Sequence, residues 1–421
     1  LTLGSRGDVQ PFVALGRGLK AKGHTVTIAT SASFEGFITG HGLEYGYLSN
    51  DLLDLMDTQE GRGAMEDTNG IFGTINTMRK LSQEGNRINR KLLGESWDAA
   101  QKVQPDLIIF HPKAFAAPHI AEKFNVPAIV AVMQPMLVST TEMPPIGIPP
   151  MNLGGWYNKM GYGLIKMGYS AYKGMVNTYR EETLGLGKLP GGTDIINATP
   201  GQKTSVMHAF SQHILPEPSD WDDHATVTGY WFLDAQDDWQ PPDDLRDFLD
   251  AGDAPVYIGF GSMAGRDPER LTRTIIDAIK QAGVRAILAS GWGGLAVDVL
   301  PESIFTIKRA PHDWLFQNVV AVVHHGGAGT TAAGLRAGRP TVICSFFGDQ
   351  PFWGQQVHKM GVGTKHIPQK KLTTDNLAAA ITESTQNQTM IASAKTLGEK
   401  IRAEDGIANA IAFIEKIAVR Q

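Results

Sequence analysis

Short apolar runs alternate with longer segments of helical spacing along the chain. In the first half the runs fall at residues 1–4, 25–30, 43–48, 106–110, 127–132, 205–210 and 226–230, and in the second half at residues 255–260, 285–290, 304–308, 319–323 and 341–345. Helical spacing follows several of them, as at residues 11–22 and 268–281. Continuous apolar runs separated by helices are typical of buried parallel strands with right-handed crossovers. The pattern therefore predicts an α/β fold with parallel, doubly wound sheets.

An acidic, proline-bearing segment at residues 234–250 interrupts this pattern near the middle of the chain. A chain of 421 residues can bury two separate cores. We therefore expect an N-terminal domain at residues 1–235, a linker at residues 236–250 and a C-terminal domain at residues 251–400. Residues 401–421 have the spacing of an amphipathic helix.

Composition narrows the class of protein. The apolar fraction of 42% and the charged fraction of 19% are those of an ordinary globular protein, and the net charge of −5 argues against a nucleic-acid partner. The single cysteine, Cys344, excludes an intrachain disulfide, which is compatible with a cytoplasmic protein. No apolar run reaches 18 residues and no signal peptide is visible, although the chain begins inside a predicted strand and a few residues are expected to precede Leu1.

The most informative stretch is residues 319–350, where two predicted strands each end in polar residues. After the first strand come His324 and a glycine-rich turn that opens a helix, with candidate ligand-binding residues Gly327, Ala328, Gly329 and Thr330. Glycines and a helix N-terminus favour an anion such as a phosphate, and His324 can add a charge-assisted hydrogen bond. After the second strand, Asp349 and Gln350 can bind sugar hydroxyls. The alternative is a glycine turn whose polar residues only cap helices.

Two motifs carry a family resemblance. VVHHGGAGTT with AGRPTVICSFFGDQPFWGQQV resembles the donor-binding signature of UDP-sugar-dependent family 1 glycosyltransferases, and most closely its sterol 3-β-glucosyltransferase and glycopeptide-antibiotic branch. GSRGDVQPFVALGRGLKAKGH, at residues 4–24, reinforces the resemblance. It implies a GT-B fold, with two Rossmann-like domains facing each other across a cleft. It also implies that the N-terminal half binds the acceptor, that the C-terminal half binds the UDP-sugar, and that the enzyme is inverting and metal-independent. The helix at residues 401–421 is expected, from the same resemblance, to pack back on the N-terminal domain.

Asp8 is the candidate catalytic residue. It follows the first predicted strand, and transfer to a hydroxyl needs a general base within reach of the acceptor oxygen. The Asp of the GSRGD motif is the presumed base in the family branch that the chain resembles. Ser5 and Arg6 of the same motif are assigned to donor binding. The alternative is that Asp8 caps the helix that follows.

Further donor-binding candidates lie at other strand ends of the second half: Ser262, Trp292, Arg309, Ala310 and His312. The chain departs here from the plant signature of the resembled family. Arg309 replaces the tryptophan that stacks on uracil, His312 replaces a glutamine, and Ala332 replaces the glutamate directed at the ribose. Trp292 or Arg309 can stack on the base, and the Ala310 backbone can read its edge. A structural role for Trp292 is the alternative.

The acceptor site is expected in the first half, with His111, Gln134 and Met136 as candidates. His111 can line that site or assist Asp8, and a structural role is the alternative. Residues 135–172 are rich in Met, Pro, Gly and Tyr, which suits the wall of an apolar pocket, although core packing and membrane contact are alternatives. One Asp-x-Asp pattern, at Asp220 and Asp222, is interpreted as surface acid, and no metal site is expected.

The sequence thus predicts a cytoplasmic UDP-dependent hexosyltransferase. A UDP-sugar, expected to be UDP-glucose, is its co-substrate, and no other cofactor is expected. The acceptor is an apolar small molecule such as a sterol, another terpenoid, a polyketide or a flavonoid. A UDP-GlcNAc 2-epimerase or GlcNAc transferase of the same fold, and a non-catalytic nucleotide-sugar or lipid-binding protein, are the alternatives. We expect a monomer or weak dimer, with peripheral membrane contact an open alternative.

Overall fold

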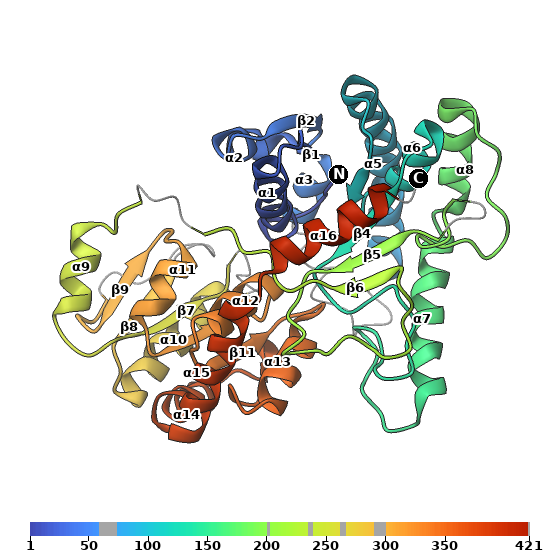
Figure 1. Cartoon of the computed structure of the whole chain (residues 1–421). Coiled ribbons are helices and arrows are strands. Elements are labelled where there is room, and N and C mark those ends of the chain that lie inside the picture. The colour runs from blue at the N-terminus through green and yellow to red at the C-terminus, as the bar shows by residue number, and fades with distance from the viewer. Residues whose placement is uncertain (59–73, 200–202, 235–238, 262–266, 290–299, 420–421) are drawn as a thin grey trace. The chain divides into compact units, whose positions relative to one another are not determined.

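The computed structural model describes residues 1–58, 74–199, 203–234, 239–261, 267–289 and 300–419 (Figure 1). The chain divides into two compact units, one formed by Leu1–Leu233 with Asp405–Gln421 and the other by Asp234–Glu404. All strand pairs in both units are parallel, as the apolar runs predicted.

The first unit contains two neighbouring sets of parallel strands. One set pairs β1 (Thr27–Ser31) with β2 (Glu44–Leu48), and the other has the order β3 (Ile108–Phe110), β4 (Ala128–Val132), β5 (Ser205–His208), β6 (Ala225–Val227). Residues 1–3, which belong to the first strand expected at residues 1–4, lie between the sets. Thr2 N–H donates to the Ala29 carbonyl of β1, and His111 N–H donates to the Leu1 carbonyl. The segment therefore joins the two sets by single hydrogen bonds and forms no ladder of its own.

Helices cover both faces of this sheet. The helices of this unit are α1 (Arg6–Ala21), α2 (Glu35–Gly40), α3 (Asp51–Asp57), α5 (Thr74–Val103), α6 (Ala117–Phe124), α7 (Gly155–Ser170), α8 (Lys173–Tyr179), a π-helical turn at Arg180–Leu184, and α16 (Gly406–Val419). Alternate residues of β4 enter different cores, since Val130 packs in the cluster that includes α5 and α6 while Ile129 packs in the cluster that includes α1 and α16. This is the two-sided burial that makes a parallel strand apolar throughout.

The second unit is a single parallel sheet with helices on both faces. Its strand order is β12 (Ile367–Pro368), β11 (Thr341–Ser345), β10 (Ala321–His324), β7 (Val256–Gly259), β8 (Ala286–Ala289), β9 (Ile304–Ile307). The helices are α9 (Asp243–Asp250), α10 (Pro268–Ala282), α11 (His312–Leu315), α12 (Ala328–Arg336), α13 (Gln350–Lys359), α14 (Thr374–Gln386) and α15 (Gln388–Ala403). Val322 and Val323 of β10 again enter opposite cores. Cys344 in β11 is fully buried, as expected of a small apolar residue.

The structure corrects the prediction that residues 236–250 form a linker. Of residues 236–250, the stretch Asp243–Asp250 forms α9 and belongs to the second unit, whose boundary falls after Leu233. The acidic composition masked an amphipathic pattern: Leu245 is 1% exposed in a core that Phe248 and Leu249 also contact. The short strand β12 was also missed, because two residues carry no periodicity.

The C-terminal helix α16 belongs to the first unit. It begins at Gly406, whereas residues 401–403 belong to α15. It packs on α1 at Gly18, where an added Cβ would lie 2.4 Å from Ile407 Cγ2. Ala410, Ile411 and Ile414 are buried there. None of the helices in the described residues is long and apolar enough to span a membrane.

Candidate active site

Asp8 lies in the first turn of α1, at the third helical position after the N-cap residue Ser5. Its Oδ2 accepts from Ser5 N–H at 2.8 Å and from Ser5 Oγ at 3.2 Å, which completes a capping box. Its backbone carbonyl accepts from Thr2 Oγ1 at 2.8 Å. Asp8 is thus not itself the N-cap, as the alternative had it, but it does satisfy the start of the helix. Its side chain stays 21% exposed.

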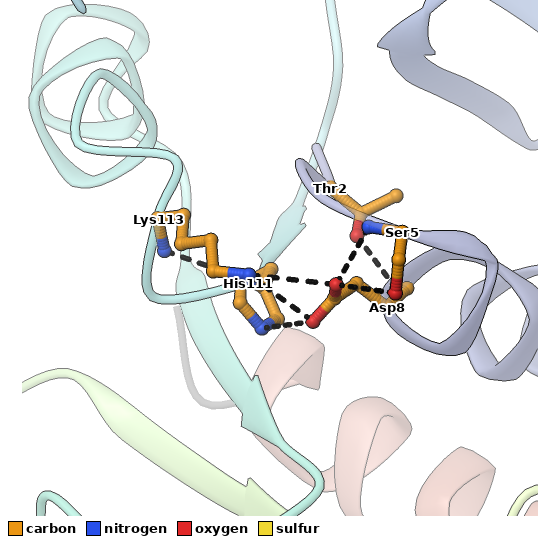
Figure 2. A network of polar contacts seen from close by, with 5 residues as sticks. All are labelled: Thr2, Ser5, Asp8, His111 and Lys113. Atoms are coloured by element: carbon orange, nitrogen blue, oxygen red, sulfur yellow. Dashed lines mark hydrogen bonds and ion pairs between the residues drawn. The ribbon is translucent and has the colours of Figure 1, made fainter. Parts of the chain in front are cut away.

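His111 comes directly after β3 and faces the other oxygen of the same carboxylate (Figure 2). Its Nε2 lies 3.3 Å from Asp8 Oδ1. Lys113 N–H donates to His111 Nδ1 at 3.2 Å. Because Nδ1 accepts, the neutral ring carries its proton on Nε2, which points it at Asp8. The structure therefore brings together Asp8, the candidate base, and His111, a candidate acceptor residue.

The charge state of His111 follows from its burial. Its side chain is 8% exposed, and desolvation lowers its pKa from 6.5 to about 4, against the opposing effect of Asp8. At neutral pH the pair is therefore a neutral imidazole beside a carboxylate.

Lys113 supplies the cation of this network, with Nζ 3.4 Å from both Asp8 oxygens. Sequence reasoning missed it, although it lies two residues after His111 at the same strand end. Gly4 was missed as well. Its φ of +134° favours glycine, and an added Cβ would lie 2.2 Å from Asp8 Oδ2. Ser5 and Arg6, assigned to donor binding, are both exposed; Ser5 holds Asp8, and Arg6 Nε donates to Gln10 Oε1 at 3.0 Å.

Topology explains why Asp8 and His111 meet. From residues 1–3 the chain proceeds to β1 and β2 on one side, and β3 lies hydrogen-bonded on the other. The connections on the two sides of the boundary between residues 1–3 and β3 therefore run in opposite directions along the sheet. In open α/β sheets, the crevice at the carboxyl ends of strands on either side of such a point is where ligands bind. Asp8 and His111 follow those two segments.

The second unit repeats this arrangement. The chain runs from β7 to β8 and β9 on one side and from β10 to β11 and β12 on the other, so the divergence falls between β7 and β10. His324 pairs with Gly259 across it. Beyond them lie Gly261 and the His324–Gly327 turn, where an added Cβ at Gly261 would lie 3.5 Å from His325 Cε1. The glycine turn predicted from the sequence therefore lies at the position expected of a ligand site.

His324 is fully buried at this point. Gly326 N–H donates to its Nδ1 at 2.9 Å, so the neutral ring carries its proton on Nε2. Among the described residues Nε2 finds no acceptor. Burial, with His325 and His312 nearby, lowers the pKa of His324 well below its usual value. The charge-assisted bond expected of His324 is therefore corrected to a neutral N–H donor, because burial disfavours the imidazolium.

The other residues of the turn form the start of α12. Gly327 is its N-cap, and Ala328, Gly329 and Thr330 form its first turn. Gly329 is exposed, and an added Cβ there would meet no atom within 4 Å. The first N–H groups of a helix have no intrahelical acceptor, so this end suits an anion.

Asp349 and Gln350 lie where α13 begins, after β11. Asp349 is the N-cap residue, and its Oδ2 accepts from Trp353 Nε1 at 2.8 Å. Gln350 is 3% exposed, and its Oε1 accepts from Phe346 N–H at 2.6 Å and from Phe347 N–H at 3.2 Å. The Gln350 carbonyl thus holds the loop, which leaves its amide NH₂ as the group with hydrogen-bonding capacity for a ligand.

Three of the remaining donor candidates follow β9, and one of them, His312, lies near His324. Arg309 is exposed and Ala310 half-buried after β9. His312 opens α11, stacked on Phe316 with ring centroids 4.5 Å apart. Ser262 and Trp292 lie outside the described residues.

The acceptor candidates Gln134 and Met136 lie in the segment after β4. Both are half-buried, and Met136 packs against a core cluster of the first unit while its carbonyl contacts His208 Nε2 at 3.1 Å. Gln134 and Met136 thus follow the strand next to β3, which carries His111.

The side chains of Asp220 and Asp222, the acidic pattern of the sequence, both bind neighbouring groups of the first unit. Asp220 accepts from Thr140 Oγ1 at 2.6 Å and from Thr141 N–H at 2.8 Å, and Asp222 pairs with Lys203 at 2.8 Å. Within the described residues, no group of three or more His, Cys, Asp or Glu side chains could hold a metal ion.

Comparison with known proteins places these features in a family. The Glycosyltransferase family 28 N-terminal domain matches residues 1–142, and the Erythromycin biosynthesis protein CIII-like C-terminal domain matches residues 284–412. Sterol 3-beta-glucosyltransferases are similar over 98% of the chain, at 40% identity in Aspergillus clavatus and 41% in Glomerella lagenarium. The chain belongs to the family 1 glycosyltransferases.

Solved structures establish the fold as GT-B. A glycotransferase of kitacinnamycin has a TM-score of 0.71 at 20% identity, and the calicheamicin glycosyltransferase CalG4 has a TM-score of 0.68 at 17% identity. Each comparison covers 99% of this chain and 97% of the other. The sterol 3-beta-glucosyltransferases are much longer proteins, since the chain spans 29% of the Aspergillus clavatus protein and 28% of the Glomerella lagenarium protein.

Proposed function

We propose that the chain transfers a hexose from a UDP-sugar, UDP-glucose in the first instance, to a hydroxyl group of an apolar small molecule. The observation that carries the proposal is the Asp8 carboxylate, partly exposed at the end of a sheet and held by donors on both oxygens. The 40% identity to sterol 3-beta-glucosyltransferases supports an apolar acceptor. A sterol, another terpenoid, a polyketide and a flavonoid all fit that chemistry.

In the proposed reaction Asp8 accepts the proton of the acceptor hydroxyl. The acceptor oxygen forms a bond to the anomeric carbon while the bond from that carbon to the diphosphate oxygen breaks, so UDP leaves and the configuration inverts. His111 and Lys113 act as positioning residues, because both contact the carboxylate and fix its direction. Because His111 is neutral at pH 7, it adds no charge of its own beside the Asp8 carboxylate.

The second unit is proposed to stabilise the departing UDP. The buried Nε2–H of His324 lacks an acceptor within the described residues, and a buried unpaired donor costs about 1–3 kcal/mol. A diphosphate oxygen would satisfy this donor, and the start of α12 supplies further N–H groups where negative charge develops. Asp349 and the Gln350 amide are proposed to hold the sugar hydroxyls. No step uses a metal ion, so turnover is expected to persist in EDTA.

The decisive experiment is substitution of Asp8. Asp8→Asn keeps the shape of the side chain and removes its basicity, so kcat for sugar transfer is expected to fall by about a thousandfold. The affinity for UDP, measured by calorimetry, is expected to stay within about twofold, since Asp8 receives no donor role in the proposal. A large loss of UDP affinity would contradict this division of roles.

Thr2→Val is the matched control. It removes the 2.8 Å hydrogen bond to the Asp8 backbone carbonyl and leaves the carboxylate in place. We expect a loss of about 1 kcal/mol in the free energy of unfolding and transfer activity within a few-fold of the original. An equal loss of transfer in both variants would mean that folding of the α1 start, rather than the Asp8 carboxylate, limits activity.

The acceptor class is tested by UDP release from UDP-glucose, with and without sterols, flavonoids and macrolides. Acceptor-dependent release together with a new glycoside mass is the expected result. UDP binding without release for any acceptor would favour a binding protein, and turnover of UDP-GlcNAc without an acceptor would favour an epimerase.

A further inference from the structure

The outward face of α7 carries an apolar stripe that the fold does not use (α7 is labelled in Figure 1). Its members are large exposed side chains: Trp156 65%, Met160 49%, Leu164 49% and Met167 64%. Their spacing places them along one side of a 16-residue helix, which is about 24 Å long. Met151 and Leu153, 53% and 45% exposed, extend the stripe into the preceding loop.

The opposite face of α7 accounts for its attachment to the first unit. Tyr157 and Tyr162 are buried there. An added Cβ at Gly161 would lie 2.8 Å from Pro145 Cδ, and one at Gly155 would lie 2.6 Å from Thr141 Cβ. The inner face therefore fits closely against its own loop. A helix that is apolar on both faces, with one face in solvent, calls for a second apolar environment.

The stripe is also unusual within the chain. Of the nine large apolar side chains exposed among the described residues, six lie in residues 151–167. Scattered exposed apolar residues are ordinary, whereas a contiguous set marks an interaction surface. The other three are Tyr47, Val103 and Val419.

The charges around the apolar stripe of α7 indicate what binds to it. Residues 143–180 contain no Asp or Glu, in a chain whose net charge is −5. They contain Lys159 and Lys166, which are exposed, and Lys173, which is half-buried and donates to the Pro190 carbonyl. Several acids around this segment are engaged by other groups: Asp194 lies 3.2 Å from Lys166 Nζ, Asp220 is held by Thr140 and Thr141, Glu142 accepts from Ser219 N–H at 2.7 Å, and Glu181 lies 3.3 Å from Lys188 Nζ. A stripe of Trp, Leu and Met beside lysines matches the interface of an anionic lipid bilayer.

We propose that α7 and residues 151–154 dock on an anionic phospholipid surface, with the stripe in the acyl boundary and Lys159 and Lys166 at the headgroups. The lysine stems can lie along the apolar surface while their ammonium groups reach phosphates. The proposal needs neither a sugar donor nor an acceptor, so it stands or fails independently of the proposed reaction.

The test is flotation of the whole chain with vesicles of phosphatidylcholine containing phosphatidylserine, compared with phosphatidylcholine alone. We expect binding to the anionic vesicles that weakens with salt. Met160→Gln with Leu164→Gln and Met167→Gln is expected to reduce partitioning by about tenfold or more. Lys159→Gln with Lys166→Gln is expected to reduce it by about fivefold per lysine, on anionic vesicles only.

Matched controls lie elsewhere on the first unit. Tyr47→Gln removes an exposed apolar side chain outside the stripe, and Lys102→Gln removes an exposed lysine outside it. Neither is expected to change partitioning by more than about twofold. Absence of binding to any vesicle, or equal losses in stripe and control variants, would overturn the proposal.

A site-specific label keeps the test independent of folding defects. Cys344, the single cysteine, is fully buried and its pKa is raised to about 12 by desolvation, so it resists alkylation. A Met160→Cys variant can thus carry one environment-sensitive fluorophore, with Lys102→Cys as control. We expect a blue shift with anionic vesicles for the label at position 160 alone. No shift at 160, or a stripe-dependent dimer in the absence of lipid, would assign the face to another partner and contradict the proposal.

Discussion

Asp8 shows how one side chain can serve structure and chemistry together. Its Oδ2 completes the capping box with Ser5, while Oδ1 faces His111 and Lys113. A capping carboxylate is fixed in direction before any ligand arrives, which is the property that a general base needs. The pattern GSRGD indicated Asp8 because of its position after a strand. It gave no indication of Lys113, whose partner lies 105 residues away in the sequence.

Gly4→Ala tests how closely the backbone confines that carboxylate. The φ of +134° disfavours alanine, and the new Cβ would lie 2.2 Å from Asp8 Oδ2 and 2.9 Å from Lys113 Nζ. Displacement of Asp8 is expected to lower kcat by about a hundredfold. The measurement is steady-state transfer, paired with a thermal melt.

Gly7→Ala is the control for Gly4→Ala. Gly7 is exposed, and its added Cβ would lie 3.7 Å from Ser5 Oγ, an ordinary contact. Because it lies inside α1, we expect the thermal midpoint to stay the same or rise. A similar fall in midpoint for both variants would show that space beside Asp8 is not the limiting feature.

At the scale of elements, the start of α12 is the clearest case of a helix placed for binding. The sequence predicted this helix from the Ala-rich segment and the turn from its glycines, and the structure confirms both. What the sequence could not supply is the neighbour of the turn. Gly259 ends β7 and Gly261 follows it, more than sixty residues earlier in the sequence. Gly259 meets His324, and Gly261 meets His325, only because β10 lies beside β7.

Two glycines of α12 form a matched pair. An added Cβ at Gly329 meets nothing within 4 Å, and one at Gly334 would make an ordinary 3.4 Å contact with Thr341 Oγ1. Each Gly→Ala change is expected to stabilise the unit by about 0.5–1 kcal/mol through helix propensity. Only Gly329→Ala, at the proposed diphosphate end, is expected to weaken UDP binding, by about tenfold. Equal UDP affinities in calorimetry would argue against a diphosphate at this end.

The contact between α1 and α16 gives a second test at this scale. Gly18→Val would place side-chain atoms where Ile407 and Ile411 pack, since a Cβ alone would lie 2.4 Å from Ile407 Cγ2. Overpacking is expected to cost about 1–3 kcal/mol in the free energy of unfolding, measured in urea. Gly36→Ala, where an added Cβ meets nothing within 4 Å, is the control. Unchanged stability in Gly18→Val would mean that α16 contributes little to the first unit.

At the scale of the whole molecule, both units carry neutral buried histidines at or near their strand ends. Desolvation lowers the pKa of His111, His208 and His325 to about 4, and that of His324 well below its usual value. In the unfolded chain each titrates near 6.5. The unfolded state therefore binds more protons between pH 6.5 and 4, so stability is full above pH 6.5 and is lost as pH falls through that window.

We expect the thermal midpoint to fall steeply below pH 6.5. The free energy of unfolding is expected to fall by about 3 kcal/mol by pH 4 through His111 alone. His208→Gln should flatten this pH dependence, whatever its effect on absolute stability. His24→Gln, at a side chain that is 48% exposed, is the control variant. An unaltered slope in His208→Gln would show that His208 is protonated in the folded protein.

The sequence by itself determined the parallel α/β class, most strands, the glycine turn at α12 and the choice of Asp8 and His324, because each rests on local periodicity or on contiguous residues. Only the tertiary structure decided what depends on distant segments. It placed His111 and Lys113 on Asp8, made His324 a neutral donor through burial, turned part of the expected linker into α9, and left the apolar stripe of α7 in solvent. Pairing across a parallel sheet, desolvation and exposure are properties of packing, and a sequence pattern carries them only indirectly.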